Sequence, residues 1–314
     1  MNKIYLQLRE EARNIIETLP LPKFYQRFDR ERTYSRQMLH SHPLLIKIKK
    51  EINPVIEDDF GHGMHHSDLV CVDAGAIIQI EMQAKLTVEI EGDSPLEMQE
   101  KPPVQMEGDS PVEMDEKIPL ETHKKPESKV VLSKDISNKI LLVQVAGLLH
   151  DIKRKEKKHS IKGANFAQTF LSTGGYPLTN DEIDQICRAI REHEAFQKVR
   201  TDHKNIVNNS QKHGNDEFST TPSLISNALY DADKFRWGPD NFTHTLWDMV
   251  MFSNAPFHEF IKRYPHGMAI LEQIKATFRT DTGKIYGPDF IDLGIEAGNQ
   301  LFKTIKSLDL TSSK

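Results

Sequence analysis

The chain has 314 residues, of which 38% are hydrophobic and 28% are charged, and its formal net charge is −5. This composition is that of a globular protein with a full core, and it excludes a strongly basic chain that binds nucleic acid. The longest apolar run, from Ile140 to Leu149, is too short to span a bilayer, and the N-terminus lacks the apolar stretch of a signal peptide. We therefore expect a cytoplasmic protein without a nucleic-acid or membrane partner.

Apolar residues at helical spacing dominate the chain from its beginning. Residues 1–50 are expected to form an N-terminal helical segment, broken at Pro20 and Pro22. The next helix is predicted from about residue 64 to residue 85. One stripe of it carries His66 together with apolar residues at steps of three and four, so the imidazole of His66 should point inward.

Residues 91–128 differ in kind from the rest of the sequence. EGDSPLEMQEK at 91–101 recurs as EGDSPVEMDEK at 107–117, and residues 91–121 have a net charge of −8. Two polar copies cannot form a solenoid, and the composition predicts a disordered acidic insertion. The remainder of the chain carries a net charge of +3, which would suit an anionic substrate.

Three further helices are predicted after the insertion. The first, at 137–152, is apolar on every side, as expected for a central buried helix, and it ends in His150 and Asp151. The second runs from about residue 160 to residue 171. The third begins with a capping box formed by Thr179 and Glu182 and reaches His193.

The C-terminal third begins with a polar stretch at 201–221, which we interpret as a loop. A helix at 222–236 follows, and residues 240–310 are again helical in pattern. Short strands remain possible at 129–132 and after Gly283. The predicted core residues of this part are Trp247, Phe252, Phe257, Phe260, Leu271 and Phe278. Cys71 and Cys187 are expected to be buried, unpaired thiols.

Several predicted helices begin or end with a histidine or aspartate on the buried side. These residues are His66, His150, Asp151, His159, His193 and Asp233. Any one buried histidine is usually a core residue, but burying the whole set without partners would cost much free energy. A shared divalent cation would satisfy them together, because imidazole and carboxylate are its natural ligands.

This ordered set resembles the H…HD…D pattern of the HD-domain superfamily of metal-dependent phosphohydrolases. GHGMHHSDLV around His66 is similar to the family's first element, AGLLHDIKR contains the His150-Asp151 pair, and DADKF contains Asp233. The resemblance implies an all-α HD-domain bundle at 51–240, interrupted by the acidic insertion, with C-terminal helices at 241–314 on the same core. Asp231 lies about 200° from Asp233 on a helix, so it is expected to support the site or cap a helix.

HSIKG at His159 and REHE at His193 resemble elements that hold a second metal in the HD-GYP subset. Carried over, they imply that Asp151 bridges two ions, although one ion per chain remains open. Glu192 stands where those relatives have histidine, and their GYP element is missing, so their cyclic-dinucleotide substrate is not implied. The metal is undecided among Mn, Mg, Fe, Co and Ni.

The resemblance implies hydrolysis of a small phosphate ester, such as a nucleotide, by a metal-activated water. Asp151 would position that water, and Arg154 and Lys153 would bind the phosphate. Two alternatives stay open: an HD-domain di-iron oxygenase, which would use the same six ligands, and a non-catalytic metal-binding scaffold that recruits a partner through the acidic repeat. Substrate identity and oligomeric state are not predicted.

Overall fold

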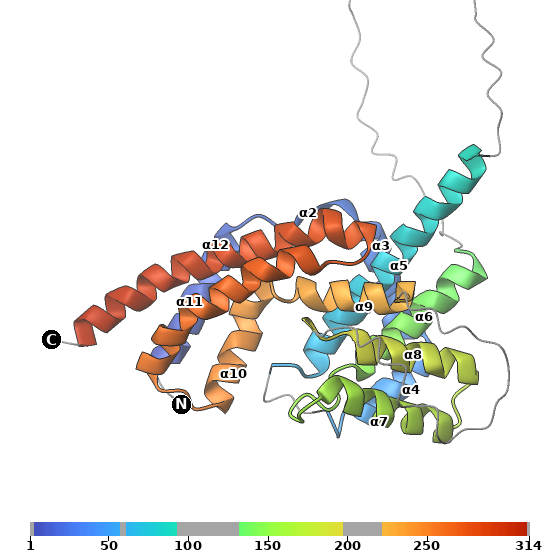
Figure 1. Ribbon diagram of the computed structural model, residues 1–314, viewed down its shortest axis with the longest axis horizontal. Coiled ribbons are helices and arrows are strands. Elements are labelled where there is room, and N and C mark those ends of the chain that lie inside the picture. The colour runs from blue at the N-terminus through green and yellow to red at the C-terminus, as the bar shows by residue number, and fades with distance from the viewer. Residues whose placement is uncertain (1–2, 57–60, 93–131, 197–221, 313–314) are drawn as a thin grey trace, which may run out of the picture.

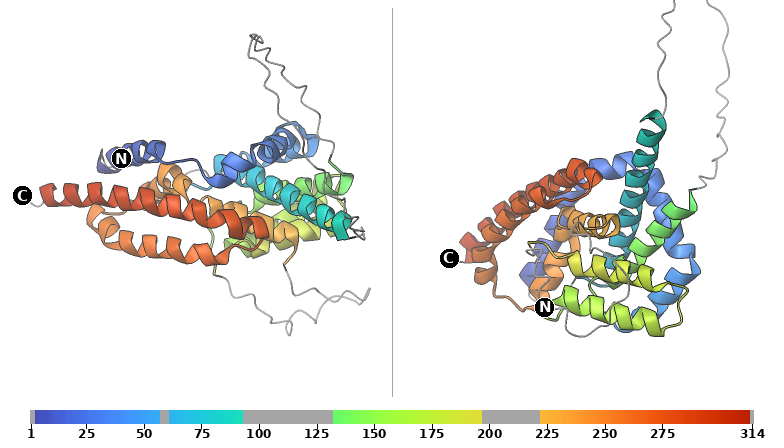
Figure 2. Two further views of the ribbon diagram at one scale, coloured as in Figure 1. Left: turned by 90° about the horizontal axis from the view of Figure 1, so that it is seen from above. Right: turned by 45° about the vertical axis from the view of Figure 1, so that its right-hand side comes forward.

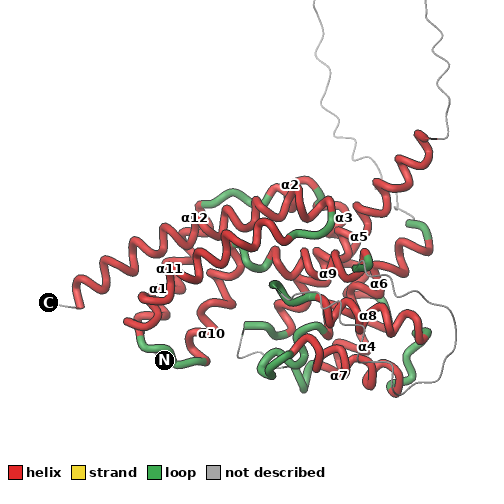
Figure 3. Tube along the Cα trace, viewed as in Figure 1, coloured by secondary structure: helices red, strands yellow, loops and turns green. Residues whose placement is uncertain are grey.

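The chain folds as an assembly of helices. The computed structural model describes residues 3–56, 61–92, 132–196 and 222–312, and within these ranges it contains helices, turns and loops without a strand (Figures 1 and 3). The prediction of an all-helical fold is therefore confirmed for the described part. The predicted insertion from residue 93 onward, the loop at 201–221 and most of the possible strand at 129–132 lie outside the described residues.

Four helices form the N-terminal part: α1 (Lys3–Thr18), α2 (Lys23–Arg27), α3 (Asp29–Ser41) and α4 (Pro43–Ile52). The stripe of α1 that contains Tyr5, Leu8, Ala12 and Ile15 is buried. Helix α1 packs on the C-terminal helix, whereas α3 and α4 pack on the centre of the bundle. The N-terminal helices thus pack on both the C-terminal helix and the centre of the bundle.

The centre of the bundle consists of five helices: α5 (Met64–Gly92), α6 (Lys134–Leu149), α7 (His159–Thr173), α8 (Asn180–Glu192) and α9 (Leu224–Phe235). Helix α5 packs against α6 and α9, and α8 packs against α6, α7 and α9. Gly147 permits the close approach of α5 and α6, because a Cβ atom there would lie 2.7 Å from Cys71 Sγ. Cys71 and Cys187 are buried free thiols, as predicted.

The C-terminal part contains a π-helical turn, η1 (Asn241–Thr245), then α10 (Leu246–Phe252), α11 (Phe257–Ile274), η2 (Lys275–Thr277) and α12 (Asp281–Ser312). Helices α11 and α12 lie side by side and extend away from α6, α7 and α8 (Figures 1 and 2). The possible strand after Gly283 is wrong, because buried residues of α12 such as Phe290, Ala297, Leu301 and Ile305 recur at helical spacing.

Most of the predicted C-terminal core residues are buried. Trp247, Phe260, Leu271 and Phe278 are each less than a tenth exposed, and Phe257 is half-buried. Phe252 is a wrong prediction, since it stands at the end of α10 and 49% of it is exposed. In the part of the chain that the structure describes, the helices fall short of the length or apolar character required to cross a membrane.

Candidate metal centre

Side chains from five helix ends meet at one point in the middle of the molecule. His66 belongs to the first turn of α5, and Asp233 belongs to the last turn of α9. The other four are His150 and Asp151 directly after α6, His159 at the start of α7, and His193 directly after α8. All six residues singled out as metal ligands in the sequence are brought together, and we call them the His/Asp cluster.

The first ligand group of the cluster lies between α5, α6 and α9. His66 Nε2 is 3.3 Å from His150 Nε2 and 3.3 Å from Asp233 Oδ1. Asp151 Oδ2 completes the group at 3.3 Å from His150 Nε2. The ligand atoms of His66, His150 and Asp233 are close enough together to coordinate one ion, and so are those of His150, Asp151 and His193.

The second ligand group lies beside the first and shares Asp151 with it. Asp151 Oδ1 is 3.4 Å from His159 Nε2 and 3.4 Å from His193 Nε2, and the two nitrogens are 3.3 Å apart. The carboxylate of Asp151 therefore presents one oxygen to each group. This is the arrangement expected of a carboxylate that bridges two cations.

The imidazole rings are oriented by acceptors behind them. His150 Nδ1 donates to the carbonyl of Gly147 at 2.8 Å, and His193 Nδ1 donates to the carbonyl of Ile190 at 2.6 Å. His159 Nδ1 pairs with Glu194 at 2.8 Å. A backbone carbonyl only accepts, so in the neutral ring the proton is on Nδ1 and the lone pair of Nε2 faces the cluster.

The cluster is buried and electron-rich. Burial raises the pKa of the Asp151 carboxyl, but His150 and His193 more than offset this and hold it well below its usual range. The pKa of Asp233 is also held low, chiefly by Lys234 against the effect of burial. Burial lowers the pKa of His159 to about 4, and the nearby Arg154 guanidinium contributes to that shift. Burial also lowers the pKa of His150, but Asp151 and Asp233 more than offset this and raise it above its usual value. Ionised carboxylates thus lie directly against the imidazole rings.

One atom of the cluster is left without a donor among the described residues. Asp151 Oδ1 is fully buried and receives no hydrogen bond, although two ring nitrogens lie near it. Arg154 Nη1 offsets part of the charge of this carboxylate, at 2.9 Å from His159 Nε2 and 3.8 Å from Asp151 Oδ1. Facing lone pairs at such distances nevertheless repel one another, and an orphaned buried oxygen costs about 1–3 kcal/mol. The residues present therefore fit a metal ion, and the nitrogen and carboxylate donors suit a divalent transition metal.

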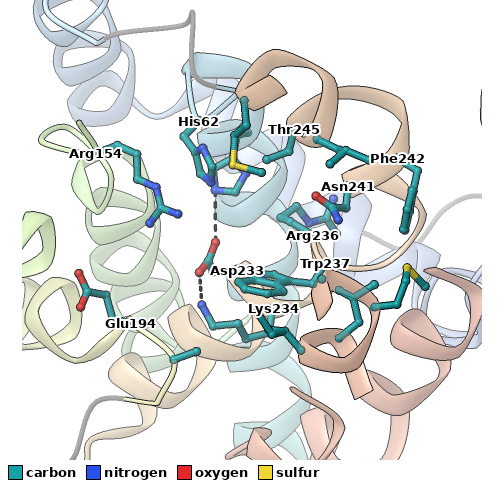
Figure 4. A pocket seen from close by; sticks show the side chains of 18 of the residues that line it. His62, Arg154, Glu194, Asp233, Lys234, Arg236, Trp237, Asn241, Phe242 and Thr245 are labelled. Carbon is teal, nitrogen blue, oxygen red and sulfur yellow. Dashed lines mark hydrogen bonds and ion pairs between the residues drawn. The ribbon is translucent and has the colours of Figure 1, made fainter. Parts of the chain in front are cut away.

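A cavity of about 470 Å³ opens on the cluster. His66, His193 and Asp233 lie at one end of it, with the side chains of Arg154 and Lys234 beside them. Figure 4 shows Arg154 and Glu194 on one side of Asp233, and Trp237 and Phe242 on the other. A ligand in this cavity would contact cations and metal-ligating atoms at the same time.

The two predicted phosphate-binding residues lie in different surroundings. Arg154 lines the cavity, and its Nη1 is 2.9 Å from His159 Nε2. Lys153 is absent from the lining residues. Its ammonium pairs with Glu156 at 3.5 Å and lies over the ring of Phe166. The structure therefore brings Arg154 to the site and leaves Lys153 outside it.

Lys234 and Glu194 line the site without having been predicted from the sequence, whereas the position of His62 one turn before His66 indicated that it could reach the mouth of the pocket. Lys234 is buried and its Nζ contacts Asp233 Oδ2 at 2.5 Å, so that Oδ1 remains directed at His66. Glu194 orients His159, and His62 lines the cavity one turn before His66. The sequence signal for Lys234 and Glu194 is that each directly follows a proposed metal ligand, in DADKF and in REHE.

The end of α9 that carries Asp233 is held by two buried carboxylates. Asp231 accepts hydrogen bonds from the backbone of Arg279 and Thr280, each at 2.8 Å, and from the hydroxyl of Thr280, which caps α12 by accepting from the backbone of Gly283. Asp73 of α5 accepts a bond from Arg236 at 2.5 Å. As expected from its angular position, Asp231 points away from the cluster and anchors the helix.

Comparison of the chain with protein-family models, with curated proteins and with solved structures finds no match. The geometry of the His/Asp cluster and its cavity is therefore the basis on which function is inferred.

Proposed function

We propose that this chain is an HD-domain phosphohydrolase that holds two divalent metal ions and cleaves a small phosphate ester. The ordered resemblance of its ligands to the H…HD…D pattern supports the family. The observation that carries the proposal is Asp151, which offers Oδ2 to the first ligand group and Oδ1 to the second. Cationic side chains beside this bridge support a phosphate rather than a neutral substrate.

Bound ions in such a site activate water as the nucleophile and polarise the phosphoryl oxygens. The chain's own residues bind and orient the phosphate. Arg154 offers its guanidinium fork to the phosphate from one side of the cavity. Lys234 neutralises the outer oxygen of Asp233 and adds a second positive charge to the same end. Hydrolysis forms one phosphorus–oxygen bond to water, breaks the ester bond, and leaves a proton on the departing alcohol.

A di-iron oxygenase is the second candidate, because the six ligands in two groups would also serve a pair of iron ions. The positive end of the cavity favours the hydrolase, since oxygen activation has no need of Arg154 and Lys234. The metal distinguishes the two. Tightly bound iron with oxygen consumption would favour the oxygenase, whereas turnover with Mn, Mg, Co or Ni would favour the hydrolase.

The proposal is tested with the adjacent residues His65 and His66. His66 is a buried member of the cluster, whereas His65 is exposed on the same turn of α5. We expect His66→Gln to lower metal content and p-nitrophenyl phosphate hydrolysis at least tenfold, because removal of a ligand weakens metal binding. His65→Gln should leave metal content and hydrolysis unchanged. Metal is measured by mass spectrometry on protein purified without a metal-affinity tag.

Equal metal content in the two variants would contradict the metal assignment. Failure of the wild-type chain to hydrolyse any phosphate ester across a panel of divalent metals would contradict the phosphohydrolase assignment. Circular dichroism of both variants shows whether a loss reflects the site or the fold.

A further inference from the structure

The cavity beside the His/Asp cluster has two chemically different ends. The end at the cluster is charged, with Arg154 and Lys234 near Asp233. The other end is formed after α9, by η1, α10 and α11. Its lining residues there are mostly apolar: Trp237, Phe242, Leu246, Met249, Phe260, Tyr264, Met268, Ile270 and Leu271. A substrate that fills the cavity therefore has a charged head and a second part that contacts apolar side chains.

Asn241 and Thr245 add a side-chain amide and a hydroxyl to this lining, and the hydroxyl donates to the carbonyl of Gly61 at 3.4 Å. Most of the other polar groups at the apolar end also have partners. The hydroxyl of Tyr264 donates to the carbonyl of Gly298 at 2.9 Å. The carbonyl of Phe242 accepts the indole N–H of Trp247 at 2.5 Å. Arg236 is bound to Asp73 and Asp240. These groups are not available to a ligand without losing a buried hydrogen bond.

Apart from the Asn241 amide and the Thr245 hydroxyl, the lining of the apolar end offers a nucleobase few hydrogen-bonding partners. A base carries several N–H and carbonyl groups, and each one buried without a partner costs about 1–3 kcal/mol. Arg263 also lines the cavity, but 82% of its side chain is exposed, so it belongs to the rim. An aliphatic chain needs no hydrogen-bonding partners, and the burial of each of its methylenes makes the free energy of binding more favourable.

We infer that the substrate is an amphipathic phosphate: a monophosphate ester of a medium-length aliphatic alcohol. Its phosphate lies at the cluster and its chain lies among the residues from Trp237 to Leu271. The inference rests on the proposed phosphohydrolase function and narrows its substrate class. At roughly 30 Å³ for a water-sized group, the cavity of about 470 Å³ holds about fifteen heavy atoms. A phosphate uses five of these, which leaves room for a chain of about ten carbons.

The test uses n-alkyl phosphonates of four, six, eight and ten carbons, which bind but are not hydrolysed. The chain contains two tryptophans, and Trp237 lines the cavity, so intrinsic fluorescence of the metal-loaded protein reports binding. We expect the Kd to fall about fourfold for each added methylene, since burial of a methylene contributes about 0.8 kcal/mol. The trend should end near ten carbons, where the cavity is full. Adenosine and uridine monophosphates should bind more weakly than decyl phosphonate.

A matched pair of variants locates the chain. Met249 lines the cavity, whereas Met251, two residues along α10, does not. Met249→Gln should lower the ratio of the Kd for butyl phosphonate to the Kd for decyl phosphonate at least tenfold. Met251→Gln should leave this ratio unchanged. If Met249→Gln fails to fold, as judged by circular dichroism, the wild-type chain-length series decides alone.

Failure of this inference is distinguishable from failure of the proposed function. Hydrolysis of p-nitrophenyl phosphate together with a Kd that is independent of chain length would overturn the amphipathic substrate and leave the phosphohydrolase intact. Tighter binding of a nucleoside monophosphate than of decyl phosphonate would overturn it as well. Absence of phosphate-ester turnover and of metal-dependent phosphonate binding would overturn the phosphohydrolase itself.

Discussion

Arg154 and Lys153 are neighbours in the sequence with the same charge and different surroundings. Both follow the His150-Asp151 pair closely enough to be predicted as phosphate-binding residues. The turn after α6 directs Arg154 toward His159 and the cavity, and it directs Lys153 toward Glu156. The identity of the residue is thus a weaker guide to its role than the direction in which the backbone sends its side chain.

We expect Arg154→Ala to lower kcat/KM for a phosphate ester by about 10- to 100-fold. A hydrogen bond to a charged group is worth about 1.5–3 kcal/mol, and Arg154 lines the cavity beside the cluster. Lys153→Ala is the matched control and should change kcat/KM less than twofold, because its ammonium lies outside the cavity. Steady-state kinetics at saturating metal measure both. Equal effects of the two substitutions would contradict the assignment of Arg154.

At the scale of elements, α8 carries its own starting signal. The hydroxyl of Thr179 accepts from the backbone of Glu182, and Glu182 accepts from the backbone of Thr179 at 2.9 Å. Glu182 also accepts from Asn138 of α6 at 2.9 Å. The capping box therefore fixes where α8 begins and ties it to the helix that leads to His150, so that His193 arrives at the cluster after a defined number of turns.

Glu182 gives stability a dependence on pH. The Thr179 backbone and Asn138 hydrogen bonds lower the pKa of Glu182 in the folded chain. Its charge therefore stabilises the fold fully above the ordinary pKa of about 4.5, and this contribution is lost as the pH falls through the lower folded-state pKa. We expect Glu182→Gln to lower the free energy of unfolding by about 0.5 kcal/mol at pH 7, because a negative charge at a helix N-terminus is favourable.

Urea denaturation of the wild type and Glu182→Gln at several pH values checks this prediction. The difference between the two chains should shrink toward zero below the folded-state pKa, where the carboxyl is protonated in both states. A difference that grows as the pH falls would have the wrong sign and would refute the assigned shift.

At the scale of the whole molecule, a buried ionic network joins segments that are distant in the sequence. Asp73 of α5 is fully buried and binds Tyr25 of α2, Arg32 of α3 and Arg236 after α9. Arg236 also binds Asp240. Because Arg236 follows Asp233 by three residues, this network links the N-terminal helices to the end of α9 that reaches the His/Asp cluster.

We expect Asp73→Ala to lower the free energy of unfolding by about 3–5 kcal/mol, because Arg32 loses the carboxylate that it pairs with and the buried Arg236 keeps only the more exposed carboxylate of Asp240. Asp68 of the same helix is the matched control. Its carboxylate pairs with Lys49, both side chains are partly exposed, and Asp68→Ala should cost at most about 1 kcal/mol. Denaturation in urea compares the two variants. A smaller loss for Asp73→Ala than for Asp68→Ala would contradict the structural role of the network.

The helical architecture and the residues of the candidate site follow from local patterns in the sequence. Hydrophobic periodicity requires only local spacing, so the helices that end before His150 and His193 were predicted to within a few residues of their ends. The start of the His66 helix was also predicted, but α5 continues to Gly92, seven residues beyond its predicted end at residue 85. The capping box at Thr179 is likewise a local pattern. The six clustered residues were recognised because each stands at the buried end of a predicted helix, and the position of a residue within a predicted helix can be read from the sequence.

How these residues combine depends on the packing of the helices against one another. The allocation of the two Asp151 oxygens to two ligand groups depends on how α6, α7 and α8 pack, which no spacing within one helix specifies. The cavity is the same kind of property, because Lys234 and the apolar residues of α10 and α11 meet there from separate segments. Helix formation is local and follows from the sequence pattern, whereas a site between helices exists only once side chains from distant segments are packed together.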